Sequence, residues 1–226
     1  MPLYGFTFFI SFETAQFKKH IAKLYRSTYL IPLPSTIVGI VGAILGVTRE
    51  NLRKFSSDKN IHAGAELICF DGTAYELARI HQFKDGRQLI PTIKRSEFLY
   101  NPKYKFAVAM SDRSVLEECM NRISSLDFEF EVFGGNDYNF LASIGKPNLG
   151  KVIESREGRG YCPLRFFYSI KPDDDKAIVS SDYVHANIRE KYVFAYKATI
   201  ACRKELPVVN DGKSKIFVYP ARDFIV

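Results

Sequence analysis

Residues 29–46 read Tyr-Leu-Ile-Pro-Leu-Pro-Ser-Thr-Ile-Val-Gly-Ile-Val-Gly-Ala-Ile-Leu-Gly, and this stretch decides the fold. A residue before a proline avoids the helical region of backbone conformation, so the chain enters the stretch in an extended form. Ser35 is a residue type that favours the N-cap of a helix, and Gly46 is typical of a helix end. The pattern therefore predicts a helix that has Ser35 as its N-cap and ends near Leu45.

The predicted helix is apolar but too short to cross a membrane. No charged residue occurs from Ser27 to Thr48, but Pro32 and Pro34 interrupt this run. The continuous apolar part, residues 37–47, would extend about 16 Å as a helix, which is roughly half of a bilayer core. We therefore expect a helix buried in a protein core and no contact with a membrane.

Outward from this helix, the sequence predicts five strands and a second helix. The strands are residues 3–12, 65–70, 73–83, 104–110 and 128–133, with an Asp71–Gly72 turn between the second and third. The second helix, residues 113–124, has Ser111 or Asp112 as its cap. When the hairpin inserted between the second strand and the strand at 104–110 is left out, the order is β, α, β, β, α, β, which is that of the ferredoxin-like split motif and of RNA-recognition folds.

The predicted fold class is therefore α+β. A ferredoxin-like, RNA-recognition-like domain covers residues 1–145, and a basic insert at about 79–105 projects from it as a long β-hairpin. Residues 146–226 contain further strand-like runs, at 165–170, 192–201 and 216–219, and form a smaller β-rich region.

Composition excludes several classes of protein. The chain of 226 residues is 46% hydrophobic and 25% charged, which is ordinary globular usage and excludes a disordered or collagen-like chain. The four cysteines stand singly, without a CxxC pair, so we expect no zinc site and no disulfide framework. Reduced thiols of this kind indicate a cytoplasmic protein.

The net charge of +7 is distributed unevenly along the chain. Residues 79–105 hold seven basic and two acidic residues, whereas residues 106–145 hold two basic and seven acidic residues and should face away from phosphates. A second basic block, residues 18–26, is interleaved with Phe17, Tyr25 and Tyr29. Cations that contact phosphates and rings that stack on bases suit a nucleic-acid strand, although a solvated loop has the same composition.

Three segments resemble markers of one protein family. The first is the stretch 29–46, with its Tyr, Pro-rich turn and Gly-containing helix. The second is Arg-Ser-Glu-Phe-Leu-Tyr-Asn-Pro-Lys-Tyr-Lys at residues 95–105, and the third is Phe-Gly-Gly-Asn-Asp at residues 133–137. In this order and spacing, which cover residues 1–145, they are similar to the CRISPR-associated Cas-five family.

The resemblance implies a subunit of a type I Cascade surveillance complex in antiviral defence. Such a subunit binds and caps the 5′ handle of the CRISPR RNA (crRNA), and its projecting hairpin is called the thumb. It contacts the backbone subunit and the large subunit, and it meets target DNA only indirectly through the complex. The resemblance implies no cofactor and no metal. We expect subtype I-B or I-A rather than I-C.

The candidate RNA-binding residues combine this implication with the chemistry of the side chains. A helix N-terminus binds phosphate, and glycine permits close approach of a strand, although packing explains Gly39 equally well. The Gly-rich turn and its Asn-Asp pair could read the edge of an unpaired base. The full set is Lys18, Lys19, His20, Arg26, Tyr29, Ser35, Thr36, Gly39, Lys94, Arg95, Phe98, Gly134, Gly135, Asn136 and Asp137.

The alternative hypothesis is a metal-independent endoribonuclease that processes pre-crRNA. The I-C branch of the family cleaves RNA with general acid–base residues, typically a Tyr, a Lys and a His, which promote attack by the ribose 2′-OH. Tyr29, His81 and Lys94 form the corresponding set here, but the sequence does not fix their geometry. Because the chain contains no hydrolase, Walker or HExxH motif, we favour RNA binding without catalysis.

Overall fold

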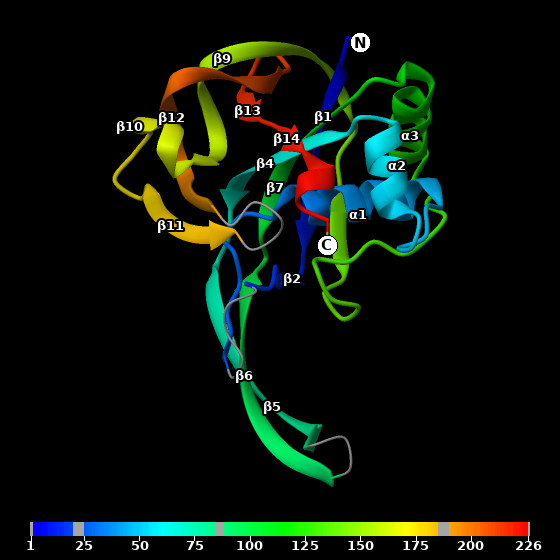
Figure 1. Ribbon diagram of the computed structural model, residues 1–226, viewed down its shortest axis with the longest axis vertical. Helices are drawn as coiled ribbons and strands as arrows, with labels where there is room; N and C mark the ends of the chain where they lie inside the picture. The colour runs from blue at the N-terminus through cyan, green and yellow to red at the C-terminus, as the bar shows by residue number, and fades with distance from the viewer. Residues whose placement is uncertain (1, 20–24, 85–87, 185–189, 226) are drawn as a thin grey trace.

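The computed structural model shows two β-sheets, with helices packed on the larger one (Figure 1). It describes residues 2–19, 25–84, 88–184 and 190–225, but not the side chains of residues 78, 80–84, 88–90, 92 and 94. In chain order, the elements are β1 (Tyr4–Phe12), β2 (Thr14–Ala15), β3 (Tyr25–Arg26), α1 (Pro34–Leu45), α2 (Leu52–Asp58), β4 (His62–Cys69), β5 (Gly72–Lys84), β6 (Gln88–Tyr100), β7 (Lys103–Met110), α3 (Arg113–Ser125), β8 (Leu141–Ile144), β9 (Asn148–Pro163), η1 (Leu164–Phe166), β10 (Phe167–Pro172), β11 (Ile178–Val184), β12 (Glu190–Asn210), β13 (Lys215–Phe217), β14 (Tyr219–Pro220) and η2 (Ala221–Asp223).

The larger sheet joins strands from both halves of the chain. Its order is β10-β12-β13-β9-β1-β7-β4-β14, with β11 paired to β12 and β8 paired to β1. At its centre, β9, β1, β7 and β4 are neighbours in antiparallel pairs, and α1 and α3 follow β1 and β7 along the chain. The α+β class is therefore confirmed. The predicted domain boundary at residue 145 stays a prediction. Strand β9, which follows it, pairs with β1 on one side and with β12 on the other.

Helix α1 begins two residues earlier than predicted. Its first residue is Pro34, and Leu33 holds the N-cap position in an extended conformation with no side-chain cap. The prediction that Ser35 caps the helix is therefore wrong. A proline suits the first helical position, since its fixed φ is already helical and its missing N–H leaves one donor fewer to satisfy. The predicted end is confirmed: Gly46 has φ of 77° and donates its N–H to the carbonyl of Ala43.

The prediction of a strand at residues 128–133 is also wrong. This segment contains bends and one isolated bridge, between Phe133 and Phe140. Its backbone N–H groups are used elsewhere, because those of Glu129 and Phe130 donate to the carbonyls of Ile44 and Ala43, at 3.4 and 3.0 Å. The segment thus satisfies carbonyls at the C-terminus of α1, which a helix cannot satisfy internally. The fourth central strand is β9.

The other predicted elements are present, with one change in connectivity. Helix α3 is capped by Asp112, whose side chain accepts hydrogen bonds from the backbone N–H groups of Ser114 and Val115. The two strands around the Asp71–Gly72 turn do not form a hairpin with each other. Strand β4 pairs with β7 in the larger sheet, whereas β5 pairs with β6 in the smaller sheet. The turn therefore redirects the chain from one sheet to the other.

Strands β5 and β6 form a long hairpin whose far end extends away from the body (Figure 1). Their pairing runs from Gly72 opposite Tyr100 to Lys84 opposite Gln88. Near the body, β6 also pairs with β2 in an antiparallel and with β3 in a parallel arrangement. Segments that precede α1 therefore hold the base of the hairpin.

The central strand β1 is buried on its core face and partly buried on the opposite face. Phe6, Phe8, Ile10 and Phe12 alternate toward the core that contains α1, and each is fully buried. The opposite face of the sheet packs on a smaller cluster, which consists of Ala107, Ala109, Val209, Ile216 and Val218. The turn between β12 and β13 lies on this second face, because the Thr7 hydroxyl donates to Asp211 at 2.8 Å.

A buried ion pair fixes that turn. Lys105 Nζ lies 2.6 Å from Asp211 Oδ2, and the two side chains are only 5% and 3% exposed. Burial by itself raises the pKa of the Asp211 carboxyl, but hydrogen bonds from Lys105, Thr7 and the backbone N–H groups of Ser214 and Lys213 outweigh this effect. The pKa of Asp211 therefore lies below its ordinary value, and the ionised carboxylate stabilises the fold.

We predict that Asp211→Asn makes the protein less stable in a pH-dependent way. A depressed carboxylate pKa stabilises the fold above the pKa of the unfolded state, near 4, and this stabilisation is lost as the pH falls through the folded pKa. At pH 7 the free energy of unfolding of the variant should be about 3 kcal/mol lower than that of the wild type, because Lys105 stays buried without its charged partner. Denaturant unfolding between pH 3 and pH 7 measures the free energy of unfolding of both proteins. The difference between the variant and the wild type should become smaller below about pH 4. A difference that is constant over this range would contradict the prediction.

A glycine allows β13 to cross close to β4. A Cβ atom on Gly64 would lie 1.8 Å from the carbonyl oxygen of Phe217, which is far inside any allowed contact. The two backbones therefore approach at a distance that only glycine permits.

We predict that Gly64→Ala lowers the free energy of unfolding by roughly 3 kcal/mol, because the backbone of β13 has to move. Gly39→Ala is the matched control: its Cβ would meet no atom within 4 Å, and alanine is favoured in a helix interior. That variant should be more stable than the wild type by up to about 1 kcal/mol. Thermal and denaturant unfolding measure both, and equal stability of the two variants would refute the steric explanation.

Candidate nucleic-acid interface

Three segments that are distant in the sequence meet at the base of the hairpin. Gln16, which is buried, connects them. Its backbone N–H donates to the carbonyl of Gly134 at 2.8 Å, and its side-chain amide donates to the carbonyl of Glu97 at 3.0 Å. Its side-chain oxygen accepts a hydrogen bond from Asn136 at 2.8 Å. The basic loop before α1, strand β6 and the Gly-rich turn are thus held in one place.

The Gly-rich turn needs both of its glycines. Gly135 has φ of 101°, and a Cβ there would lie 2.1 Å from the carbonyl oxygen of Gln16. The N–H of Gly134 donates to the carbonyl of Asn139 at 2.7 Å, and the Asn136 amide donates to Tyr138 as well as to Gln16. These donors therefore position the turn, and the exposed Asp137 is the side chain of the turn that faces solvent.

Five of the candidate residues line one groove between α1 and this turn. They are Thr36, Gly39, Gly135, Asn136 and Asp137, and the groove has a volume of about 320 Å³. A Cβ atom on Gly39 would meet no other atom within 4 Å, so the glycine leaves space on the α1 side of the groove. Ser35 does not line the groove. Since Glu131 and Asp137 do, the groove suits a hydrogen-bond donor such as a base amino group better than it suits a phosphate.

Two basic candidates lie beside the groove. Lys18, exposed, forms a bridge with Thr28 across the loop. Burial and the neighbouring Arg26 cation lower the pKa of Lys18, and the Asp137 carboxylate partly offsets this. Two cations that repel each other in this way would both be stabilised by an anion placed between them.

Two other candidates of the basic loop contact strands in the body of the protein. Lys19 forms an ion pair with Asp182 at 2.8 Å. Tyr29 is buried, stacks on Phe194 with the ring centroids 5.7 Å apart, and donates its hydroxyl to the carbonyl of Tyr183 at 2.8 Å. The loop is therefore attached to β11 and β12 through these two side chains.

The hairpin base carries a cluster of an arginine and two tyrosines. The Arg95 guanidinium lies 4.0 Å from the ring centroid of Tyr75 and 5.7 Å from that of Tyr25. Tyr75 is 51% exposed, and its hydroxyl donates to Glu97 at 3.3 Å. Burial and a hydrogen bond with Tyr75 raise the pKa of Tyr25 to about 12, so the Tyr25 phenol stays protonated at neutral pH. The cluster thus presents planar groups to solvent.

Phe98 has a packing role. It is buried and contacts Tyr138 edge to face, with the ring centroids 6.0 Å apart. Tyr138 itself is exposed and adds a ring to the rim of the interface.

The remaining candidates are outside the described part of the chain. His20 is not described, and neither are the side chains of His81 and Lys94, so the alternative catalytic set stays a prediction. Among the described residues, no three His, Cys, Asp or Glu side chains are grouped to hold a metal ion. No helix within the described ranges is long and apolar enough to span a membrane.

Sequence reasoning missed Tyr75 and Tyr138. Tyr75 lies before the predicted basic insert, which starts at about residue 79. Tyr138 directly follows the last residue of the Gly-rich marker. The usable signal was the strand period of two, which puts Tyr75 and Leu77 on the same face as Arg95 in a paired hairpin.

Comparison with known proteins places the chain in a family. The sequence matches, over residues 7–166, the family described as "CRISPR-associated protein (Cas_Cas5)". No curated protein sequence matches the chain. Among solved structures, it is similar to a chain of a "CRISPR RNA-guided surveillance complex", with 12% identity, a TM-score of 0.50 and coverage of 88% of this chain and 91% of that chain.

A CRISPR protein from Archaeoglobus fulgidus is also similar, with 10% identity, a TM-score of 0.49 and coverage of 95% and 98%. At 12% identity, the likeness to the surveillance-complex chain supports the fold alone. The sequence match covers most of the chain and includes all three marker segments. The chain therefore belongs to the CRISPR-associated Cas5 family.

Proposed function

We propose that this chain is an RNA-binding subunit of a CRISPR effector complex and holds the 5′ handle of crRNA at the base of its hairpin. The observation that carries the proposal is the junction at Gln16, where the basic loop, the hairpin and the Gly-rich turn converge. Family membership supports the CRISPR setting, and the similar fold of a surveillance-complex chain is consistent with it.

The proposed architecture follows from the sheet order. Strands β9, β1, β7 and β4 lie side by side and antiparallel, with helices after β1 and β7, which is the arrangement of a ferredoxin-like domain. In this proposal the hairpin of β5 and β6 is the thumb. In this proposal the residues after β9 form a β-rich region that continues the same sheet.

The junction offers separate groups for phosphates and for bases. Lys18 and Arg26 on one side, and Arg95 on the hairpin, supply cations for the RNA backbone. The Tyr25, Tyr75 and Arg95 cluster supplies planar surfaces on which unpaired bases stack. Asp137 in the groove supplies an acceptor for the amino group of a base. We further propose that the backbone subunit and the large subunit contact this chain, and that target DNA reaches it only through the complex.

The endoribonuclease alternative has less support. It requires the Tyr29 hydroxyl to reach the RNA, but this hydroxyl is bonded to the carbonyl of Tyr183 in the interior. A general acid or base has to come within hydrogen-bond distance of the proton that it transfers.

We predict that the double variant Lys18→Glu, Arg26→Glu loses most of its affinity for repeat-derived RNA. Each lost phosphate contact should reduce the slope of log K against log salt concentration by about 0.7. Fluorescence anisotropy at several salt concentrations measures both quantities, and EDTA in the buffer reports any metal-independent cleavage. The control is Lys171→Glu, Lys176→Glu, a double reversal of exposed residues outside the junction. Equal losses in both double variants would contradict a specific interface.

We predict a different signature for Tyr75→Ala. Loss of a stacking ring should weaken RNA binding by about 1–3 kcal/mol and leave the salt slope unchanged, because no charge is removed. Tyr75→Phe keeps the ring and is the matched control; it should bind as the wild type does. If Tyr75→Phe weakens binding as much as Tyr75→Ala, the phenol rather than the ring makes the contact.

A further inference from the structure

The helix layer ends abruptly beside β9. Phe6 on β1 and Leu149 on β9 are register partners, so their side chains lie on the same face of the sheet. Phe6 is fully buried, whereas Leu149 is 68% exposed. The reason is that α1 packs on β4 and α3 packs on β1 and β7, one strand short of β9. The described chain thus leaves an apolar strip of β9 uncovered.

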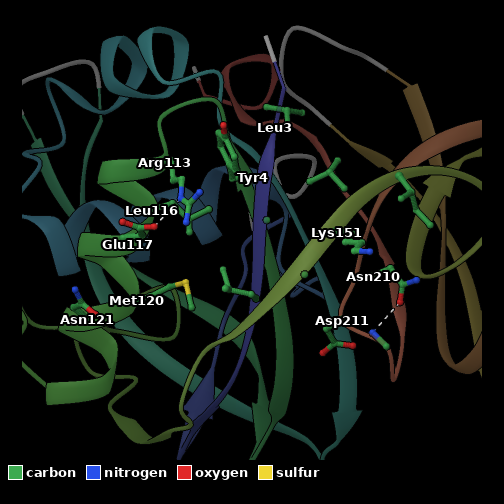
Figure 2. A pocket seen from close by; sticks show the side chains of 16 residues that line it. Leu3, Tyr4, Arg113, Leu116, Glu117, Met120, Asn121, Lys151, Asn210 and Asp211 are labelled. Carbon is green, nitrogen blue, oxygen red and sulfur yellow. Dashed lines mark hydrogen bonds and ion pairs between the residues drawn. The ribbon is translucent and has the colours of Figure 1, made fainter.

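This strip is one wall of a groove beside α3. The groove has a volume of about 900 Å³ and runs between α3 and β9. Figure 2 shows the α3 side chains, among them Met120, along one side, Lys151 on the other side, and Tyr4 between them. Leu149 and Ile153 add exposed apolar surface to the β9 wall.

The backbone of β9 at this place has no free edge. Tyr4 is opposite Lys151 on one side, and Asn210 is opposite Lys151 on the other. A partner therefore cannot add a strand here and has to be recognised through side chains. The element that fits beside α3, in the same layer and over an apolar sheet face, is a further helix.

The charges at the rim specify what this helix carries. Arg113 is paired with Glu117 at 2.7 Å, and Asp211 is paired with Lys105 below the surface. Lys151 forms no ion pair with any side chain that the structure describes. One uncompensated cation in an apolar groove suits a single carboxylate. RNA, which needs several cations along its backbone, is disfavoured here.

We propose that this groove receives an amphipathic α-helix of another subunit of the effector complex. Its apolar side packs on Tyr4, Leu149 and Ile153, and an Asp or Glu beside that side pairs with Lys151. The proposal rests on the proposed function, since it requires that the chain is a subunit of a complex.

The first experiment identifies what lies in the groove. The photocrosslinker p-benzoylphenylalanine replaces Leu149 in the full-length chain, which is co-expressed with the neighbouring effector proteins and purified as the complex. We expect a crosslink to an amphipathic, acidic helix of another subunit, mapped by mass spectrometry, and none to that helix from the exposed position 168. A crosslink to RNA, to a second copy of this chain or to nothing in the assembled complex overturns the proposal. Failure of the wild-type chain to assemble with the effector proteins overturns the proposed function as well.

The second experiment tests the charge and the apolar contact. Leu149→Glu and Lys151→Glu should each weaken association with the crosslinked subunit about tenfold or more, while affinity for the RNA alone stays at the wild-type value. Leu164→Glu, an exposed leucine outside the groove, is the matched control and should have no effect. Thermal unfolding verifies that the variants fold. Exchange of the partner's carboxylate for Lys should restore binding to Lys151→Glu, and unchanged association of both groove variants refutes the proposal.

Discussion

Strand β1 is covered on both of its faces, and the rest of the molecule depends on this burial. One face supplies four fully buried side chains to the core under α1 and α3. The other face receives the turn after β12, which the Lys105–Asp211 ion pair fixes at 2.6 Å. Since β1 also pairs with β7, β8 and β9, the two halves of the chain meet on a single strand. Because a shift of one residue in register would move the four buried side chains of β1 to the opposite face, the burial of its core face fixes the register.

The same arrangement positions the candidate interface. The chain leaves β1 directly into the basic loop, and Gln16 in that loop bonds to both the hairpin and the Gly-rich turn. The hairpin strands continue as β7 beside β1, so the base of the hairpin is rigidly placed even though its far end extends from the body (Figure 1). A site built on such a junction keeps its cations and rings in fixed relation, which favours binding.

The sequence predicted most elements because their signals are local. The capping residue Asp112, the glycine after α1 and the turn glycines each act within a few residues. The wrong prediction of a strand came from a local signal that hydrogen bonds to another part of the chain override. The alternation at residues 128–133 imitates a strand, but the carbonyls of Ala43 and Ile44 use its N–H groups. The RNA-binding role of Lys19 and Tyr29 stays a prediction, and their side chains contact Asp182 and Tyr183 of a distant strand.

By itself, the sequence determined the α+β class, the buried first helix and the family to which the chain belongs. These follow from periodicity, caps and short motifs, which depend on neighbours along the chain. Only the tertiary structure decided which basic and aromatic residues share a surface, because strand pairing joins Tyr25, Tyr75 and Arg95 from three separate segments. Likewise, the open groove beside β9 exists because the two helices cover only part of the sheet, and coverage of a sheet is a property of the packed layers.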